Sequence, residues 1–173
     1  ESIFTNAEVH IAEDMLAAVY ASSGKNPAIV CILGTGSNSC YFDGEKIHMK
    51  VASLGYTLMD EASGNYFGKQ LIRDYYYEKM PKQIAQFFEQ QYDLDIDHVK
   101  FNLYRQPNPN MYLATFAKFM FEFKESEYIK KTIRNGFKEF FEYRILPFDE
   151  PQNTPVYFIG SIAHYFRDTL EKV

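Results

Sequence analysis

Residues 28–38 read Ala-Ile-Val-Cys-Ile-Leu-Gly-Thr-Gly-Ser-Asn, and this stretch decides the fold. The unbroken apolar run 28–33 has the length of a buried strand, and 39–42 is a second strand candidate, so the glycines fall at the bend of a hairpin. Gly34 and Gly36 can adopt positive φ and let a ligand approach the main chain, while the residues between and after them add small polar side chains. Such a loop suits a phosphate, although an isolated loop of this kind is more often only a turn.

Predicted strands and helices alternate on both sides of this hairpin. A short strand is predicted at 7–12 and a helix at 15–20, which places Asp14 at a strand-to-helix junction. Asp43 and Gly44 form a hairpin turn before a third strand in which residues 47, 49 and 51 are apolar. The further predicted elements are a helix from Ala62 or Ser63, a helix after Pro81, a loop at 105–110, helices at 112–123 and 129–141, a strand at 156–159 and a final helix opened by Gly160 and Ser161.

The composition is that of a folded α/β protein. Aromatic residues make up 17% of the 173 residues, which indicates large buried side chains and several helices packed on a sheet. The net charge of −5 without a basic cluster argues against nucleic-acid binding. No apolar run approaches the roughly 20 residues that cross a bilayer, and no signal peptide opens the chain, so no membrane partner is expected. The chain begins without Met and stops inside a predicted helix, so we expect a piece of a longer protein.

The cysteines and histidines predict neither a disulfide framework nor a metal site. Cys31 and Cys40 are the only cysteines, and both fall in predicted strands, where small buried thiols are the usual interpretation. We therefore expect a cytoplasmic, reducing location. The four histidines are scattered without partners at metal-ligand spacing, so no metal bound by His or Cys is expected.

Four features need one explanation: the carboxylate of Asp14, the glycine hairpin, the run Gly55-Tyr-Thr-Leu-Met-Asp-Glu-Ala-Ser-Gly64, and the turn Gly160-Ser161. Singly, each has an ordinary structural interpretation, such as a helix cap or a strand-to-helix turn. Their order resembles that in the C-terminal half of the N-acetylglucosamine kinases, which belong with the BadF-type ATPases in the superfamily of actin, sugar kinases and heat-shock chaperones. The resemblance covers nearly the whole chain.

The resemblance implies an α/β fold, the ribonuclease-H-like C-terminal lobe of an actin-like ATPase, with helices packed on a mixed β-sheet. Residues 1–173 would form this single lobe, and the N-terminal lobe would lie outside the chain. The implied activity of the full protein is ATP-dependent phosphorylation of an amino sugar, with N-acetylglucosamine as the expected substrate. The implied site residues are Asp14 as catalytic base, Gly34, Thr35, Gly36, Gly160 and Ser161 for ATP, and Ser37, Asn38, Ser53, Leu54, Gly55, Tyr56 and Asp60 for the sugar.

The sequence departs from the family pattern at several positions. Met59 and Ala62 replace two glycines of the family's sugar loop, so the loop either avoids positive φ there or has shifted. Thr115 stands near the position of a family ATP-binding glycine, so that site is not carried over. The family's first phosphate motif is absent, and Mg²⁺ is expected mainly through the missing lobe. The chain alone is therefore expected to be inactive.

Two alternatives stay open. One is an activator ATPase of the dehydratase and reductase type, which shares the fold and uses an iron–sulfur cluster that needs thiolate ligands. The other is a sugar- or nucleotide-binding module without turnover, because the substituted sugar loop could have lost catalysis. The resemblance also leaves a homodimer open.

Overall fold

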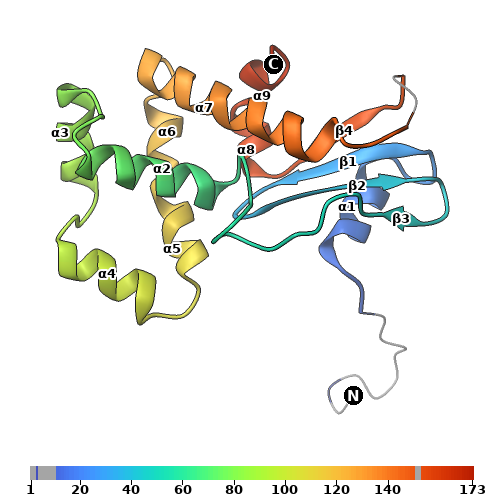
Figure 1. Ribbon diagram of the computed structural model, residues 1–173, viewed down its shortest axis with the longest axis horizontal. Coiled ribbons are helices and arrows are strands. Elements are labelled where there is room, and N and C mark those ends of the chain that lie inside the picture. Colours follow the sequence, from blue (N-terminus) through green and yellow to red (C-terminus); the bar gives the residue numbers. More distant parts are fainter. Residues whose placement is uncertain (1–2, 4–10, 151–152) are drawn as a thin grey trace.

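Four strands form one mixed sheet in the computed structural model, which describes residues 3, 11–150 and 153–173 (Figure 1). The strands are β1 (Ala28–Leu33), β2 (Ser37–Phe42), β3 (Ile47–His48) and β4 (Val156–Ile159). Their order is β3-β2-β1-β4, and β1 pairs antiparallel with β2 and parallel with β4. The apolar run 28–33 is thus the central, buried strand, as its composition predicts.

The turn of the β1–β2 hairpin is shorter than the sequence predicts. Leu33 pairs with Ser37, and the Gly34 amide donates a 3.0 Å hydrogen bond to the Gly36 carbonyl, so only residues 34–36 form the turn. Ser37 and Asn38 therefore belong to β2, which begins two residues before the predicted start. This register points their side chains to opposite faces of the sheet.

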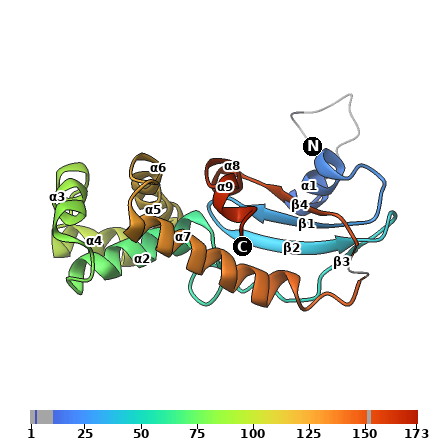
Figure 2. The ribbon, with the colours of Figure 1, turned by 90° about the horizontal axis from the view of Figure 1, so that it is seen from above.

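Helices lie on both faces of the sheet and extend beyond one of its ends. Figure 2 shows α1 on one face, α7 on the other, and α2 to α6 beside the sheet. The helical segments are α1 (Asp14–Ser22), α2 (Gly64–Tyr76), α3 (Lys82–Gln91), α4 (Ile96–Tyr104), α5 (Pro109–Phe116), α6 (Lys118–Glu122), α7 (Glu127–Phe140), the π-helix η1 (Phe141–Ile145), α8 (Ser161–Tyr165) and α9 (Arg167–Leu170). None of the helices in the described ranges is long and apolar enough to cross a membrane.

The sheet separates two apolar clusters because successive side chains of β1 point to opposite faces. Val30 belongs to the smaller cluster, with Met15 and Val19 of α1. Leu33 belongs to the larger cluster, which continues into the helices and is rich in phenylalanine. Within it, α2 and α5 cross so closely that a Cβ on Gly68 would lie 1.8 Å from the Leu113 carbonyl oxygen. The high aromatic content therefore fills this helical core.

Several predicted elements differ from the observed ones. The third strand pairs with β2 only at Ile47–His48, so the alternation through residue 51 does not continue as a strand. The sequence did not predict α4, and the predicted helix 112–123 is two helices, α5 and α6. The predicted strand 7–12 lies mostly outside the described residues, and residues 11 and 12 have no regular structure.

Candidate functional site

Two glycine turns lie side by side where the parallel strands β1 and β4 end. Gly34 follows β1, and Gly160 follows β4 with a φ of 115°, which side chains rarely adopt. A Cβ on Gly160 would lie 2.3 Å from the Leu33 carbonyl oxygen and 3.1 Å from the Gly34 amide nitrogen. Glycine at 160 is therefore required for the two turns to touch, and the crevice beyond the carboxyl ends of parallel strands is a common place for ligands.

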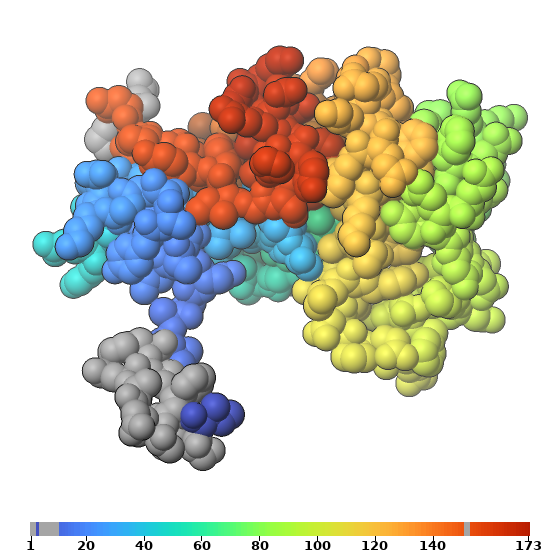
Figure 3. Space-filling view, turned by 180° about the vertical axis from the view of Figure 1, so that it is seen from behind, coloured from blue at the N-terminus to red at the C-terminus, as the bar shows by residue number. Residues whose placement is uncertain are grey.

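A cleft of about 570 Å³ opens beside these turns. The hairpin turn forms one wall, and α5, α6 and α8 form the others; Figure 3 shows α8 next to α5 and α6 from behind. The lining residues are Gly34, Thr35, Gly64, Met111, Ala114, Thr115, Ala117, Lys118, Phe121, Glu122, Ser161, Ile162 and Tyr165. The structure thus brings together Gly34, Thr35 and Ser161, which the sequence analysis assigns to ATP, and it places Gly160 directly behind them.

The cleft combines hydrogen-bond donors with an aromatic wall. Among the described residues, the amides of Thr35 and Gly36 donate no hydrogen bond. Thr35 lines the cleft, so its amide is available to an anion there, whereas Gly36 is not a lining residue and lies against Asp60. The polar residues Thr35, Thr115, Ser161 and Lys118 line the same space, and the Thr115 hydroxyl already donates to the Tyr112 carbonyl. Opposite them, the rings of Phe121 and Tyr165 are stacked with centroids 4.3 Å apart and planes at 25°. This arrangement suits a ligand that has a flat apolar part and a polyanionic part.

The N-terminus of α2 holds the hairpin turn in place. The Gly64 amide donates to the Gly34 carbonyl at 2.7 Å, and the Asn65 amide donates to the Thr35 carbonyl at 2.9 Å. Ser63 caps the same helix, because its side chain accepts a hydrogen bond from the Tyr66 amide. These α2 amides are therefore used to position the turn and are not free for a ligand.

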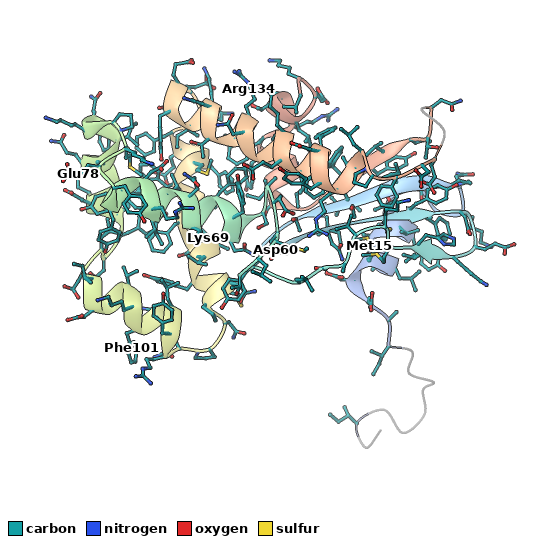
Figure 4. The ribbon with its side chains drawn as sticks, in the orientation of Figure 1. Met15, Asp60, Lys69, Glu78, Phe101 and Arg134 are labelled. Atoms are coloured by element: carbon teal, nitrogen blue, oxygen red, sulfur yellow. The ribbon has the colours of Figure 1, made fainter. Side chains whose placement is uncertain are left out.

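Asp60 is a buried carboxylate directly behind the turn. Only 7% of the residue is exposed, and a Cβ on Gly36 would lie 2.9 Å from Asp60 Oδ2. The Asn65 side-chain amide donates a 2.8 Å hydrogen bond to the same oxygen. Figure 4 shows Asp60 where the sheet meets the helices. Asp60 is thus packed against the turn, in contrast to the solvated helix cap that is the ordinary interpretation of an Asp-Glu pair.

Glu61 and Arg144 form an ion pair that anchors this loop. Arg144 Nε donates to Glu61 Oε2 at 3.0 Å, and the two side chains are 1% and 15% exposed. Arg144 Nη1 also donates to the Ala52 carbonyl, while the Arg144 carbonyl accepts from the Ser39 hydroxyl at 2.7 Å. Arg144 lies in the π-helix η1, a type of irregularity that often occurs near functional sites. The ion pair therefore links residues 52–61 to β2 and to the end of α7.

The residues assigned to the sugar divide into two groups. Ser37 is buried and donates to the Glu61 carbonyl at 2.7 Å, and Asn38 accepts a hydrogen bond from the Ser39 amide, so both are used within the fold. The second group, Ser53, Leu54, Gly55 and Tyr56, lies on the loop that precedes Asp60. Ser53 and Leu54 are exposed, and Gly55 and Tyr56 are half-buried. The Tyr56 carbonyl accepts a hydrogen bond from Lys69 Nζ, which fixes that part of the loop to α2.

The two residues that stand in place of family glycines, Met59 and Ala62, differ in backbone conformation. Ala62 is fully buried and keeps a left-handed conformation at φ 57°, and Asp60 has φ 70°, whereas Met59 is not left-handed. A left-handed side-chain residue costs roughly 1 kcal/mol. The loop therefore retains its strained shape at Ala62, and strain of this kind is concentrated at ligand-binding segments.

Asp14 belongs to α1, which packs on the opposite face of the sheet from α7. It is exposed and opens α1, and its side chain makes no hydrogen bond with another described residue. Helix α1 packs on β1 and connects to its start through residues 23–27, so the helix and the strand run in opposite directions.

Cys31 and Cys40 are both buried, free thiols. Cys31 belongs to the larger apolar cluster and Cys40 to the smaller one, so the two side chains lie on opposite faces of the sheet. Burial raises the pKa of the Cys40 thiol to about 11 and raises that of Cys31 further above its usual value. These two cysteines therefore cannot ligate one iron–sulfur cluster.

Within residues 3, 11–150 and 153–173, no three or more His, Cys, Asp or Glu side chains are arranged to hold a metal ion. The polar side chains that line the cleft belong to Thr35, Thr115, Lys118, Glu122 and Ser161. Hydroxyls and an ammonium group fit phosphate oxygens, and Glu122 is the one carboxylate residue among these lining residues.

Comparison with known proteins places this geometry in context. No protein-family model matches the chain, and no curated protein does. Among solved structures, a candidate N-acetylglucosamine kinase from Porphyromonas gingivalis is 38% identical with a TM-score of 0.86, over 92% of this chain and 56% of that one. The predicted resemblance to the N-acetylglucosamine kinases is confirmed. A second candidate N-acetylglucosamine kinase, from Chromobacterium violaceum, is 20% identical with a TM-score of 0.73 over the same shares, and supports the fold alone.

The comparisons also confirm the fold class. The mixed sheet with packed helices is the ribonuclease-H-like fold of the sugar kinases, as the sequence predicts. The chain spans 56% of the length of each of these two proteins.

Three residues of the site were not predicted from the sequence. Thr115 lines the cleft, although its position was set aside because a glycine was expected there. Asn65 and Arg144 contact the loop 52–61 or its carboxylates, but neither belongs to a family motif. The only available signal for Asn65 was its place directly after the helix start at Ser63 and Gly64.

Proposed function

We propose that the whole protein is an ATP-dependent sugar kinase that phosphorylates an amino sugar, with N-acetylglucosamine as the expected substrate. The observation that carries the proposal is the cleft, because the hairpin turn, Ser161 and an aromatic pair line one space of about 570 Å³. Both solved relatives described above are candidate kinases of this sugar, and the first is similar over 92% of the chain. The proposal extends to a cytoplasmic location, which the buried free thiols favour.

On this proposal, the nucleotide occupies the cleft. The adenine lies against Phe121 and Tyr165, and the phosphates lie against the Thr35 amide and the Ser161 hydroxyl. Phosphoryl transfer depends chiefly on positioning and on stabilising the charge that develops on the phosphoryl oxygens, which fixed amides and hydroxyls supply. Mg²⁺ would neutralise part of this charge and would be held mainly by protein outside this chain.

The sugar would lie on the other side of the turn, against residues 53–60. Asp60 would accept hydrogen bonds from sugar hydroxyls, and Ser53, Leu54, Gly55 and Tyr56 would complete its binding surface. Ser37 and Asn38 would act by supporting this surface, since their side chains are already bonded within the protein. Asp14 would take the proton from the attacking hydroxyl when the lobes close.

Residues 1–173 alone should not catalyse the reaction, because the chain spans only 56% of the length of each solved relative and would supply only part of the site. Of the two alternatives, the iron–sulfur activator is disfavoured by the positions of Cys31 and Cys40 on opposite faces of the sheet. The binding module without turnover differs from the kinase only in its product, so an assay must decide between them.

The deciding experiment incubates the full-length protein with ATP, Mg²⁺ and a panel of hexoses and amino sugars, and identifies the products by mass spectrometry. We expect a phosphorylated amino sugar, with N-acetylglucosamine as the best substrate. Binding of sugar and ATP without any product would favour the module. Iron in the purified protein with sugar-independent ATP hydrolysis would favour the activator.

A further inference from the structure

Asn65 is a fully buried polar residue at the start of α2. It makes two contacts with different parts of the site. Its backbone amide donates to the Thr35 carbonyl at 2.9 Å, and its side-chain Nδ2 donates to Asp60 Oδ2 at 2.8 Å. One residue therefore connects the phosphate loop, residues 34–36, with the carboxylate of the sugar loop, residues 53–61.

The side chain of Asn65 is poorly explained by stability alone. A carboxylate accepts hydrogen bonds and does not donate them, so Nδ2 must face Asp60 and Oδ1 faces away. Asn65 Oδ1 is buried and has no hydrogen-bond partner among the described residues. Burying an unpaired acceptor is costly. An apolar side chain would avoid that cost but would leave the buried Asp60 carboxylate without its hydrogen-bond donor, so the reason for an asparagine lies in Asp60.

The carboxylate of Asp60 supplies that reason. Asp60 has a left-handed backbone and is packed against Gly36, and its only hydrogen bond to a described side chain comes from Asn65. Without this bond, no hydrogen bond from a described side chain would fix the rotation of the carboxyl group about the Cβ–Cγ bond. With it, Oδ2 is held and Oδ1, which accepts no hydrogen bond from described residues, is left for a ligand hydroxyl.

We propose that Asn65 is a positioning residue for the sugar: it fixes the Asp60 carboxylate through Oδ2 and ties that carboxylate to the phosphate loop through the Thr35 carbonyl. This inference rests on the proposed function and deepens it. Asn65 does not touch the sugar, so it acts through Asp60. The affinity for the sugar then depends on the Asn65 side chain, which holds Asp60. The position of the phosphate loop depends on the Asn65 backbone amide, and a substitution of the side chain leaves that amide in place.

The experiment measures kcat and the KM values of N-acetylglucosamine and ATP in the full-length protein. Asn65→Leu removes the donor and keeps the number of side-chain non-hydrogen atoms, and Asn65→Ala is a second, smaller replacement without a donor if leucine impairs folding. We expect the KM for the sugar to rise about tenfold, the loss expected for a hydrogen bond to a charged group, with the KM for ATP unchanged. Asp74→Asn is the matched control, because Asp74 is a buried hydrogen-bonded residue at the other end of α2.

A double-mutant cycle separates positioning from a general structural effect. In an Asp60→Asn background, Asn65→Leu should no longer raise the KM for the sugar, because the carboxylate on which it acts is gone. An unchanged KM in folded Asn65→Leu protein, or an equal rise in the Asp60→Asn background, would overturn the inference. A wild-type protein that phosphorylates no sugar would overturn the proposed function itself, so the activity of the wild type distinguishes the two failures.

Discussion

Removal of the Glu61 carboxylate should destabilise the protein strongly. In Glu61→Ala, the Arg144 guanidinium stays 1% exposed, loses its only ionic partner among the described residues, and keeps one 3.3 Å hydrogen bond to the Ala52 carbonyl. Arg144 Nη2 is already buried without a partner, so the fold offers no second acceptor nearby. Breaking a buried ion pair in this way costs about 3–5 kcal/mol. For a domain of this size, that corresponds to a fall in Tm of about 10 °C.

The assay is thermal unfolding followed by circular dichroism, with Glu171→Ala as the matched control. Glu171 also pairs with an arginine Nε, at 2.7 Å, but both side chains are mostly exposed, so its removal should change the free energy of unfolding by less than about 1 kcal/mol. Replacing both members of the buried pair, as Glu61→Leu with Arg144→Met, should restore most of the lost stability, since no charge then remains buried. Equal Tm values for Glu61→Ala and Glu171→Ala would refute this reasoning.

The remaining predictions concern Gly160, Asp14 and the two buried thiols. Gly160→Ala should lower the free energy of unfolding by about 3 kcal/mol and weaken nucleotide binding, because the new Cβ would clash with β1 at a φ of 115°. Gly24→Ala is the control for backbone strain alone, because Gly24 is also left-handed but has open space around it. An equal loss of Tm in the two variants would contradict the clash. Asp14→Asn should lower kcat by about 10²- to 10⁴-fold, whereas Asp97→Asn, at the first turn of α4, should not; an unimpaired kcat would show that Asp14 is not the base. Neither cysteine should react with iodoacetamide at pH 8 in the native protein, since burial raises the pKa of Cys40 to about 11, and peptide mapping should detect both labels only in denaturant.

The sequence predicts best the elements whose signals are local. The apolar strands β1 and β4 follow from composition, the helix α2 follows from the spacing of its apolar residues, and all three are confirmed. The helix α4 escaped prediction because its buried side is reduced to Val99, although Asp95 offered a capping signal that the structure uses. The split between α5 and α6 follows Thr115, whose hydroxyl bonds back to the Tyr112 carbonyl, a contact that often bends helices.

The site was predictable only where a family motif marks it. Gly34, Thr35 and Ser161 come together because parallel strands bring their carboxyl ends to one edge of the sheet. The partner of Glu61 was not predictable, because Arg144 is 83 residues away and nothing local distinguishes it from a surface arginine. The role of Asn65 likewise depends on two loops that meet only in the folded protein.

The most direct test of the account is transfer of label from γ-labelled ATP to N-acetylglucosamine by the full-length protein. We predict that the label appears in a sugar phosphate, and that Gly160→Ala slows the transfer because the nucleotide cleft is distorted. Release of labelled phosphate that does not depend on sugar, with no labelled sugar formed, would contradict the central claim that this cleft serves a sugar kinase.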